Sequence, residues 1–229
     1  MMAEHPNATP AALAATLADE LRQAIAARGQ ATLAVSGGKS PIALFEQLRS
    51  QALDWSRVAV LLVDERCVAQ DHADSNTALV RQHLLQDAAA AARFVALFDD
   101  LPAPLDAQAQ QTLVDQANRR LGTLAFPLDV VVLGMGEDGH TASLFPAAPG
   151  LEHALSSPGP MACVRPTTAP HARLTLTLPV LLAARRLHLP LAGEKKREVY
   201  AAARQQADKA LPISLLLNNP ACEVQVWLA

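Results

Sequence analysis

The sequence has few aromatic side chains, little cysteine and no excess of positive charge. Only 3% of its 229 residues are aromatic, and they are scattered, so they form no stacking platform for nucleic acid. Lys and Arg number 19 against 22 Asp and Glu, for a net charge of −3, which argues against a nucleic-acid partner because such proteins carry a basic excess. Three widely spaced cysteines, Cys67, Cys163 and Cys222, match neither a disulfide framework nor a zinc spacing and fit a reducing compartment.

Long apolar runs and a leader-like start are also missing. No apolar run approaches the ~20 residues that span a bilayer, and the opening MMAEHPNATP lacks the basic and apolar stretches of a secretory signal. We therefore expect a cytoplasmic protein with no membrane partner. Hydrophobic residues make up 51% of the chain, which at this length is enough to bury a core without a metal or a disulfide.

Short apolar runs alternate with amphipathic stretches along most of the chain. The predicted strands span residues 31–35, 58–63, 93–97, 128–133, 173–178, 187–191 and 223–228, and the predicted helices span residues 11–28, 41–50, 75–85, 105–121 and 194–206. Strands that are apolar throughout and alternate with helices indicate a mostly parallel central sheet covered on both faces. We predict an α/β fold of three layers, α/β/α, in a single domain over residues 1–229. The proline-rich stretches 101–104 and 146–170 are expected to be loops.

Three predicted strands end in unusual residues. The segments SGGKSP (36–41), DER (64–66) and GMGEDGH (134–140) each follow a strongly apolar run. In an open α/β sheet, ligands bind beyond the carboxyl ends of the strands. We therefore expect these three segments to line one crevice.

The double-glycine turn SGGKSP is predicted to bind an anion. Two glycines let the backbone approach a ligand closely, and Ser40 followed by Pro41 predicts an N-cap and a first helical residue. A helix start presents free N–H groups to an anion such as phosphate, although an ordinary strand–helix turn is an alternative interpretation. The ending Gly38-Lys39-Ser40 is also found in nucleotide P-loops, but Leu33 stands where that motif requires glycine.

The second glycine turn, GMGEDGH, satisfies G-x-G-x-x-G after a strand, as a dinucleotide site would. Pro146 and Pro149, however, stop the following helix after about two turns, so the segment is not a dinucleotide-binding unit, and we predict no cofactor. The turn instead presents Asp138 and His140 beside backbone N–H groups. Histidine titrates near neutral pH and is the commonest general base, which makes His140 the candidate base; a solvated surface histidine is the alternative.

Charged residues near the other turns are candidates for binding a ligand. Asp64, Glu65 and Arg66 could bind sugar hydroxyls, move a proton or hold an anion, or could form a surface ion pair. Further cations are Arg173, Arg185, Lys195 and Lys196. His72 and His83 lie eleven residues apart without a metal-ligand spacing, so we predict no metal site.

Together these residues resemble the 6-phosphogluconolactonases, which share a superfamily with glucosamine-6-phosphate deaminases and ribose-5-phosphate isomerases. The most specific match is GMGEDGHTASLFP (134–146). SGGKSP is similar to the family's Ser-Gly-Gly-x-Thr-Pro, with Ser40 in place of threonine, and DERCVAQDHADSN (64–76) is similar to its Asp-Glu-Arg segment. The deaminases share the Asp-Gly-His core but continue with Asn-Glu-Pro where this chain has SLFP (143–146), which favours the lactonases. The chain departs from the pattern in residues 1–10, which make a poor first strand.

The resemblance implies hydrolysis of 6-phospho-D-glucono-1,5-lactone to 6-phosphogluconate, in the oxidative branch of the pentose phosphate pathway. The implied partner is a small sugar-phosphate lactone, and we expect a monomer or a weak homo-oligomer. His140 and Asp138 are the expected catalytic residues, with His140 taking a proton from water. The expected substrate-binding residues are Ser36, Gly37, Gly38, Ser40, Asp64, Arg66, Gly136, Arg173 and Lys196. Lys195 is an alternative to Lys196, and Arg185 is a weaker candidate.

Three other functions compete with this hypothesis. An isomerase or deaminase of the same superfamily would use Asp64 as a base toward a carbon-bound proton. A sugar-phosphate-binding regulator would bind ligand without catalysis. An NAD-dependent oxidoreductase is disfavoured by the short helix after the second glycine turn. Which of Asp64, Glu65 and Asp138 faces the ligand stays open.

Overall fold

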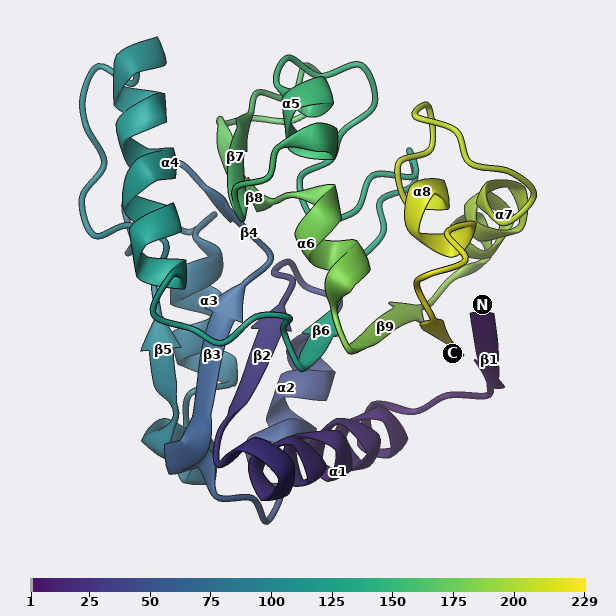
Figure 1. Ribbon diagram of the computed structural model, residues 1–229. Helices are drawn as coiled ribbons and strands as arrows, with labels where there is room; N and C mark the ends of the chain where they lie inside the picture. Colours follow the sequence, from purple (N-terminus) through teal and green to yellow (C-terminus); the bar gives the residue numbers. More distant parts are fainter. Residues whose placement is uncertain (1) are drawn as a thin grey trace.

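A seven-stranded parallel sheet forms the centre of the computed structural model, which describes residues 2–229 (Figure 1). Its strands run in the order β1-β10-β9-β6-β2-β3-β5, and neighbouring strands pair in parallel. The strands are β1 (Met2–Pro6), β2 (Ala31–Val35), β3 (Val58–Leu62), β5 (Arg93–Val95), β6 (Val130–Val132), β9 (Arg186–Leu191) and β10 (Val224–Leu228). All residues of β2, β3 and β6 are buried, as expected for strands covered on both faces.

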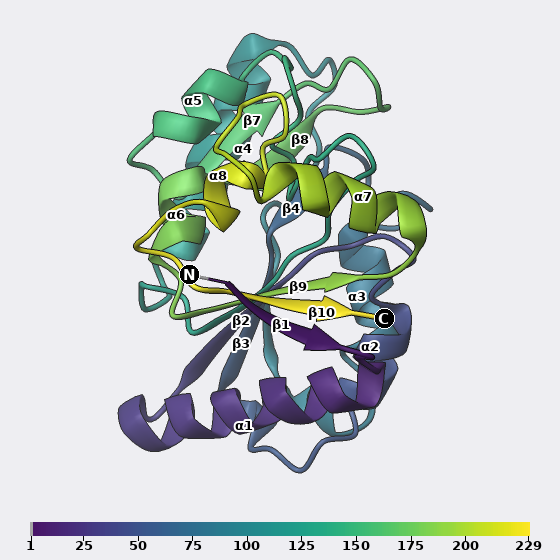
Figure 2. The ribbon, with the colours of Figure 1, turned by 90° about the vertical axis from the view of Figure 1, so that its right-hand side faces the viewer.

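Helices cover both faces of the sheet, which confirms the predicted three-layer arrangement (Figure 2). The helices are α1 (Pro10–Arg28), α2 (Ile42–Leu48), α3 (Asn76–His83), α4 (Ala107–Leu121), α5 (Leu151–Ser156), α6 (Leu178–Ala183), α7 (Glu194–Ala203) and α8 (Ser214–Leu217). Two 3₁₀ turns, η1 (Trp55–Arg57) and η2 (Asp87–Ala91), precede β3 and β5. Helix α1 lies below the sheet in Figure 2, and α6, α7 and α8 lie above it. None of the helices in residues 2–229 combines the length and apolar character needed to cross a membrane.

Side chains cap some of the helices but not α2, for which the sequence predicted a cap. Thr9 caps α1 by accepting a hydrogen bond from the Ala12 N–H at 3.2 Å, and Ser75 caps α3 in the same way through Ala78. The prediction that Ser40 caps α2 is wrong, because Pro41 occupies the N-cap position and no side chain caps this helix. Ser40 instead lies inside a turn that is closed by the Ile42 N–H and the Lys39 carbonyl, 3.4 Å apart.

A second, smaller sheet was not predicted. It consists of β4 (Asp64–Arg66), β8 (Arg173–Leu176) and β7 (Met161–Val164), paired antiparallel in the order β4-β8-β7. It stands above the central sheet in Figures 1 and 2, next to the carboxyl end of β3, which leads directly into β4. The predicted strand at 173–178 therefore exists as β8 but pairs outside the central sheet.

Two predicted irregular segments contain regular structure. Residues 146–170 were expected to be a loop, yet they hold α5 and β7, because their prolines lie before and between these elements and not inside them. Residues 1–10 were expected to make a poor strand, yet β1 pairs with β10 along its whole length. β1 is an edge strand with one neighbour, which explains its polar sequence MAEHP. Residue 1 lies outside the described residues.

Candidate active site

A cavity of about 260 Å³ opens at the carboxyl ends of β2, β6 and β9. This volume is close to the lower end of the range for small-molecule sites. The lining includes every residue predicted to bind substrate, together with the predicted base: Ser36, Gly37, Gly38, Ser40, Asp64, Arg66, Gly136, His140, Arg173 and Lys196. The three segments that the sequence placed at strand ends therefore meet around one space.

Asp138 does not line the cavity but holds the imidazole of His140. The His140 Nδ1 lies 2.5 Å from the Asp138 Oδ1, and the His140 backbone N–H donates to the same oxygen at 3.1 Å. On its other side the ring stacks on Phe145, with centroids 4.0 Å apart and planes 21° apart. The carboxylate and the phenyl ring fix the orientation of the imidazole. With Nδ1 engaged, Nε2 is the nitrogen that remains to accept a proton.

Gly136 makes this arrangement possible because it has no side chain. A Cβ at this position would lie 2.2 Å from the His140 Nδ1 and 2.5 Å from the Asp138 Oδ1, closer than any real contact. The turn is closed by the Gly136 N–H, which donates to the His140 carbonyl at 2.9 Å. The second glycine of the turn is therefore required by the close approach of the imidazole and carboxylate to the backbone.

Ser36 joins the two glycine turns. Its Oγ accepts a hydrogen bond from the Gly134 N–H at 2.9 Å, and its backbone N–H donates to the Val132 carbonyl at 3.0 Å. These bonds tie the end of β2 to the end of β6, which are neighbours in the sheet. Convergence of the two turns thus follows from the strand order together with one buried hydroxyl.

Asn76 belongs to the cavity lining but was not among the predicted substrate-binding residues. It is 2% exposed and packs so closely over the double-glycine turn that a Cβ at Gly37 would lie 1.9 Å from its Oδ1. Its Nδ2 donates to the Asp64 carbonyl at 2.8 Å, which aims Oδ1 toward the cavity. The one sequence signal for Asn76 was its place at the end of the segment DERCVAQDHADSN.

Buried polar atoms without a partner gather in this cavity. Among residues 2–229, the buried side-chain nitrogen and oxygen atoms without a hydrogen bond are Arg66 Nε, Asn76 Oδ1 and Arg173 Nε. All three residues line the cavity. An unsatisfied buried polar group is costly unless a ligand or water completes it, so the three side chains that carry these atoms are candidates for contacts with a bound molecule.

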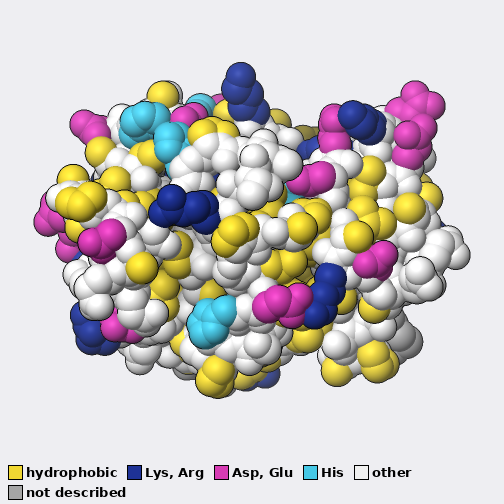
Figure 3. Space-filling model, turned by 90° about the horizontal axis from the view of Figure 1, so that it is seen from above, with side chains coloured by type: hydrophobic (Ala, Val, Ile, Leu, Met, Phe, Trp, Pro, Cys, Tyr) yellow, Lys and Arg dark blue, Asp and Glu magenta, His cyan; other side chains and the backbone are white. Residues whose placement is uncertain are grey.

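Two arginines give one side of the cavity its positive charge. Arg66 is half-buried, and its Nη1 donates to the Asp74 carbonyl at 2.5 Å. Arg173 is 7% exposed and lies over the Phe145 ring, 5.6 Å from its centroid. Burial lowers the pKa of Arg173, but arginine keeps its charge in proteins. Seen from above in Figure 3, charges of both signs and histidines are interspersed, so no single-sign surface covers this face.

The structure separates the two neighbouring acids. Asp64 lines the cavity, where its Oδ2 accepts from the Ser143 Oγ at 2.5 Å and lies 3.8 Å from the Arg173 Nη1. Glu65 points away from the cavity and accepts hydrogen bonds from three backbone N–H groups, those of Arg66, Asn76 and Thr77, at 2.6 to 2.8 Å. Burial raises the pKa of Glu65. Glu65 therefore holds the segment that carries Arg66 and Asn76, and it does not face a ligand.

Two of the candidate cations lie elsewhere. Lys196 lines the cavity, whereas the Lys195 Nζ pairs with the Glu137 Oε2 at 2.7 Å outside it, and this hydrogen bond raises the pKa of Lys195. Arg185 lies at the opposite end of the sheet, where its Nε is 3.4 Å from the Asp129 Oδ1. The proposal of Arg185 as a site residue is wrong, because Arg185 precedes β9 and the cavity lies at the carboxyl ends of the strands.

Cys67 is unsuited to be a nucleophile. The side chain is buried, and this burial raises the pKa of the thiol to about 12. A thiolate is the reactive form of cysteine, so Cys67 stays protonated and inert at neutral pH.

Comparisons with known proteins agree over nearly the whole chain. The family model for glucosamine-6-phosphate isomerases/6-phosphogluconolactonase matches residues 4–227. A 6-phosphogluconolactonase of Pseudomonas aeruginosa is 44% identical over 211 residues, covering 91% of this chain and 86% of the relative. One of Neisseria meningitidis is 41% identical over 230 residues, covering 99% of this chain and 97% of the relative. The crystal structure of a 6-phosphogluconolactonase from Shewanella baltica, 40% identical, superimposes with a TM-score of 0.91 over 100% of this chain and 97% of that one.

Proposed function

The chain belongs to the glucosamine-6-phosphate isomerase/6-phosphogluconolactonase family, and on this premise we propose that it hydrolyses 6-phospho-D-glucono-1,5-lactone by a water molecule that His140 activates. Relatives that are 41–45% identical over most of the chain are 6-phosphogluconolactonases, so the chain is a lactone-hydrolysing enzyme. The product is 6-phosphogluconate, formed in the oxidative branch of the pentose phosphate pathway.

The chemistry needs one positioned base. A lactone is an activated ester, so water can attack its carbonyl carbon without a nucleophilic side chain or a metal. His140 Nε2 takes a proton from the attacking water as the new carbon–oxygen bond forms, and Asp138, 2.5 Å from Nδ1, stabilises the imidazolium. When the ring carbon–oxygen bond breaks, the imidazolium returns the proton to the departing ring oxygen. General base catalysis of this kind contributes about 10²–10⁴ in rate.

The phosphate of the substrate serves as a handle distant from the reacting carbon. We assign it to the double-glycine turn (residues 36–40) together with Arg66, Arg173 and Lys196. The observation that carries this proposal is that Arg66, Arg173 and Asn76, each with a buried polar atom that lacks a hydrogen-bond partner, line one cavity with His140. The arginines match an anion, and the Asn76 oxygen matches a sugar hydroxyl. Binding energy from the phosphate can then position the lactone for attack.

The geometry gives less support to an isomerase or deaminase. Such an enzyme would use Asp64 as a base toward carbon, but the Asp64 Oδ2 already accepts from Ser143 at 2.5 Å and lies 3.8 Å from Arg173. These contacts already occupy the Asp64 Oδ2, which leaves this oxygen less free to approach a carbon-bound proton. Solvent deuterium appearing at C2 of a hexose phosphate would favour that activity over the lactonase.

The decisive experiment follows the disappearance of lactone generated in situ from glucose 6-phosphate. We expect fast loss with the wild-type protein and a decrease of about 10²–10⁴ in kcat for His140→Ala. His153→Ala, a change at an exposed position on α5, is the matched control and should keep full activity. Full activity in His140→Ala would refute the assignment of the base. A wild-type protein that binds 6-phosphogluconate but leaves lactone decay unchanged would refute the enzymatic function itself.

A further inference from the structure

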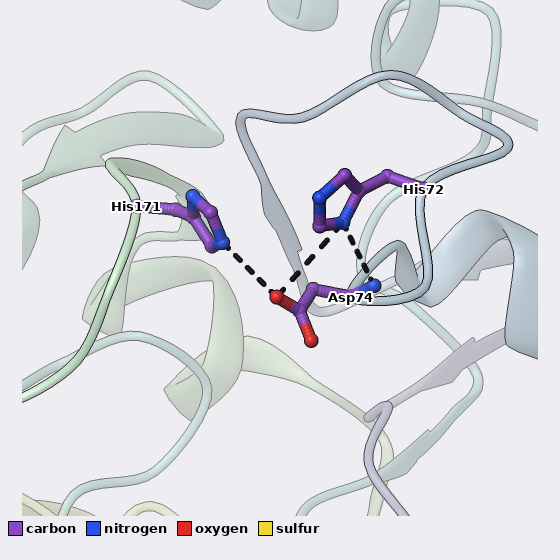
Figure 4. Close-up of side chains that lie close together, drawn as sticks. All are labelled: His72, Asp74 and His171. Atoms are coloured by element: carbon purple, nitrogen blue, oxygen red, sulfur yellow. Dashed lines mark hydrogen bonds and ion pairs between the residues drawn. The ribbon is translucent and has the colours of Figure 1, made fainter.

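Two histidines and one aspartate gather on the surface beside β4 and β8 (Figure 4). His72 and Asp74 come from the segment between β4 and α3, and His171 comes from the segment between β7 and β8. One ligand atom from each side chain lies within 4.8 Å of the others. The His171 Nε2 is 3.1 Å and the His72 Nδ1 3.9 Å from the same Asp74 oxygen, Oδ2. None of the three residues lines the cavity described above.

The small sheet holds these two segments side by side. Arg66 in β4 pairs with Arg173 in β8, and the Cys67 N–H donates to the Ala172 carbonyl at 2.9 Å. One residue before Ala172, the backbone of His171 is in the left-handed region, with φ 69°, a conformation that is uncommon for residues other than glycine. The sheet and this bend therefore fix the His171 imidazole opposite Asp74, although 97 residues separate them in sequence.

The donor set matches a transition-metal cation. Imidazole nitrogens and a carboxylate oxygen are common zinc ligands, with metal–ligand distances of about 2.0–2.2 Å. In a tetrahedral site these distances put neighbouring ligand atoms about 3.3–3.5 Å apart. The His171 Nε2 and the His72 Nδ1 lie 3.1 and 3.9 Å from the Asp74 Oδ2. Both distances are close to that spacing, so small rotations of these side chains would bring the three atoms to a tetrahedral arrangement.

We propose that His72, Asp74 and His171 bind one zinc ion, with water as the fourth ligand. The ion replaces two hydrogen bonds, the one between His171 and Asp74 and the one in which the His72 Nδ1 accepts from the Asp74 N–H at 3.0 Å, by metal–ligand bonds and joins the two surface segments. It does not take part in lactone hydrolysis, because its ligands lie outside the cavity that holds His140. Its effect is to fix the segment whose Asp74 carbonyl accepts a hydrogen bond from Arg66.

The test is calorimetric titration of zinc chloride into untagged protein that has been stripped with a chelator and dialysed. We expect one ion per chain and a melting temperature that rises with zinc, because a ligand that binds only the folded state stabilises it. Asp74→Asn and His171→Asn should each weaken binding by at least about 100-fold, since even changes to the groups around a metal's ligands cost about 10–100-fold. Asparagine is chosen at position 171 because it tolerates the left-handed backbone.

His153→Ala is the control, because His153 is an exposed histidine outside the cluster, and it should bind zinc as the wild type does. Substituting Co²⁺ gives a second readout, since the visible spectrum of a four-coordinate cobalt site should appear in the wild type and be absent from His171→Asn. Failure of the wild type to bind zinc would overturn the proposal. Equal affinity in His171→Asn and the wild type would also overturn it, as would loss of binding in His153→Ala.

Discussion

Replacing Gly136 by alanine should disable the site without unfolding the protein. The new Cβ would lie 2.2 Å from the His140 Nδ1, 2.3 Å from its Cε1 and 2.5 Å from the Asp138 Oδ1. Carbon atoms in contact stay about 3.5 Å apart, so the imidazole and the carboxylate must each move by about 1 Å. The atoms in the way are the ends of side chains and not backbone, and the Gly136 backbone is outside the left-handed region. The fold can therefore absorb the change, whereas the His140–Asp138 pair cannot.

The magnitude follows from that displacement. A 1 Å misplacement of a catalytic group costs about 10²-fold in rate, and complete loss of a general base costs about 10²–10⁴-fold. We expect kcat of Gly136→Ala to decrease by about 10²-fold or more, with KM for the phosphorylated lactone changed far less because Arg66 and Arg173 are untouched. The measurement is the initial rate of lactone loss at several substrate concentrations, together with the circular dichroism spectrum and the melting temperature.

Gly134→Ala is the matched control, because it adds the same methyl group to the same turn. At Gly134 the nearest atom to a new Cβ is the Ser36 Cβ at 3.7 Å, an ordinary van der Waals contact, so activity should stay near that of the wild type. Wild-type kcat in a folded Gly136→Ala protein would show that the tight packing around His140 is not needed for the reaction. Equal losses in the two variants would show that the turn fails for a reason other than this contact.

Two further predictions concern neighbouring residues of β4, Glu65 and Arg66. Arg66→Ala should raise KM for the phosphorylated lactone by about 10-fold or more, since hydrogen bonds to charged groups contribute about 1.5–3 kcal/mol. KM for unphosphorylated gluconolactone should change little. Equal effects on the two substrates would show that Arg66 does not bind the phosphate. For Glu65, burial raises the pKa of the carboxyl above its ordinary value of 4.5. The folded protein therefore binds this proton more tightly than the unfolded chain does. The free energy of unfolding should fall as the pH rises from 4.5 through the raised pKa. Glu65→Gln cannot titrate and should lack this part of the slope in urea unfolding curves between about pH 4 and 7; identical slopes in the two proteins would contradict the raised pKa.

Local patterns were enough to locate most of the central sheet. Strands β2 and β3 are short, mostly apolar runs that are followed by turn residues, so the local sequence is enough to predict them. Helix α1 has a left-handed Gly29 just past its end, as its sequence predicts. The glycine turns after β2 and β6 were likewise visible, and the rule that ligands bind at the carboxyl ends of parallel strands placed them around one cavity.

Local sequence patterns did not predict the edge strand β1 or the antiparallel pairing of β4 with β8. β1 has a polar sequence and becomes a strand only because β10 offers it a free edge. β4 is three residues long, too short for any periodicity to mark it, and its pairing with β8 joins segments about a hundred residues apart. For such elements the hydrogen-bonding partner determines the structure, and the partner is not encoded in the neighbouring residues.

The class of fold could be predicted from the alternation of apolar runs and amphipathic stretches along the chain. The glycine turns and His140 as a candidate base could be predicted because each depends on residue types within one short segment. Which polar and charged side chains line the cavity, and which hold other segments in place, became visible only in the three-dimensional structure. It turned Glu65 toward three backbone N–H groups, brought Asn76 over Gly37 and placed Arg185 at the far end of the sheet. The physical reason is that burial and hydrogen bonding of a polar side chain depend on which distant segments pack against it, and these contacts form only when the strands have taken their order.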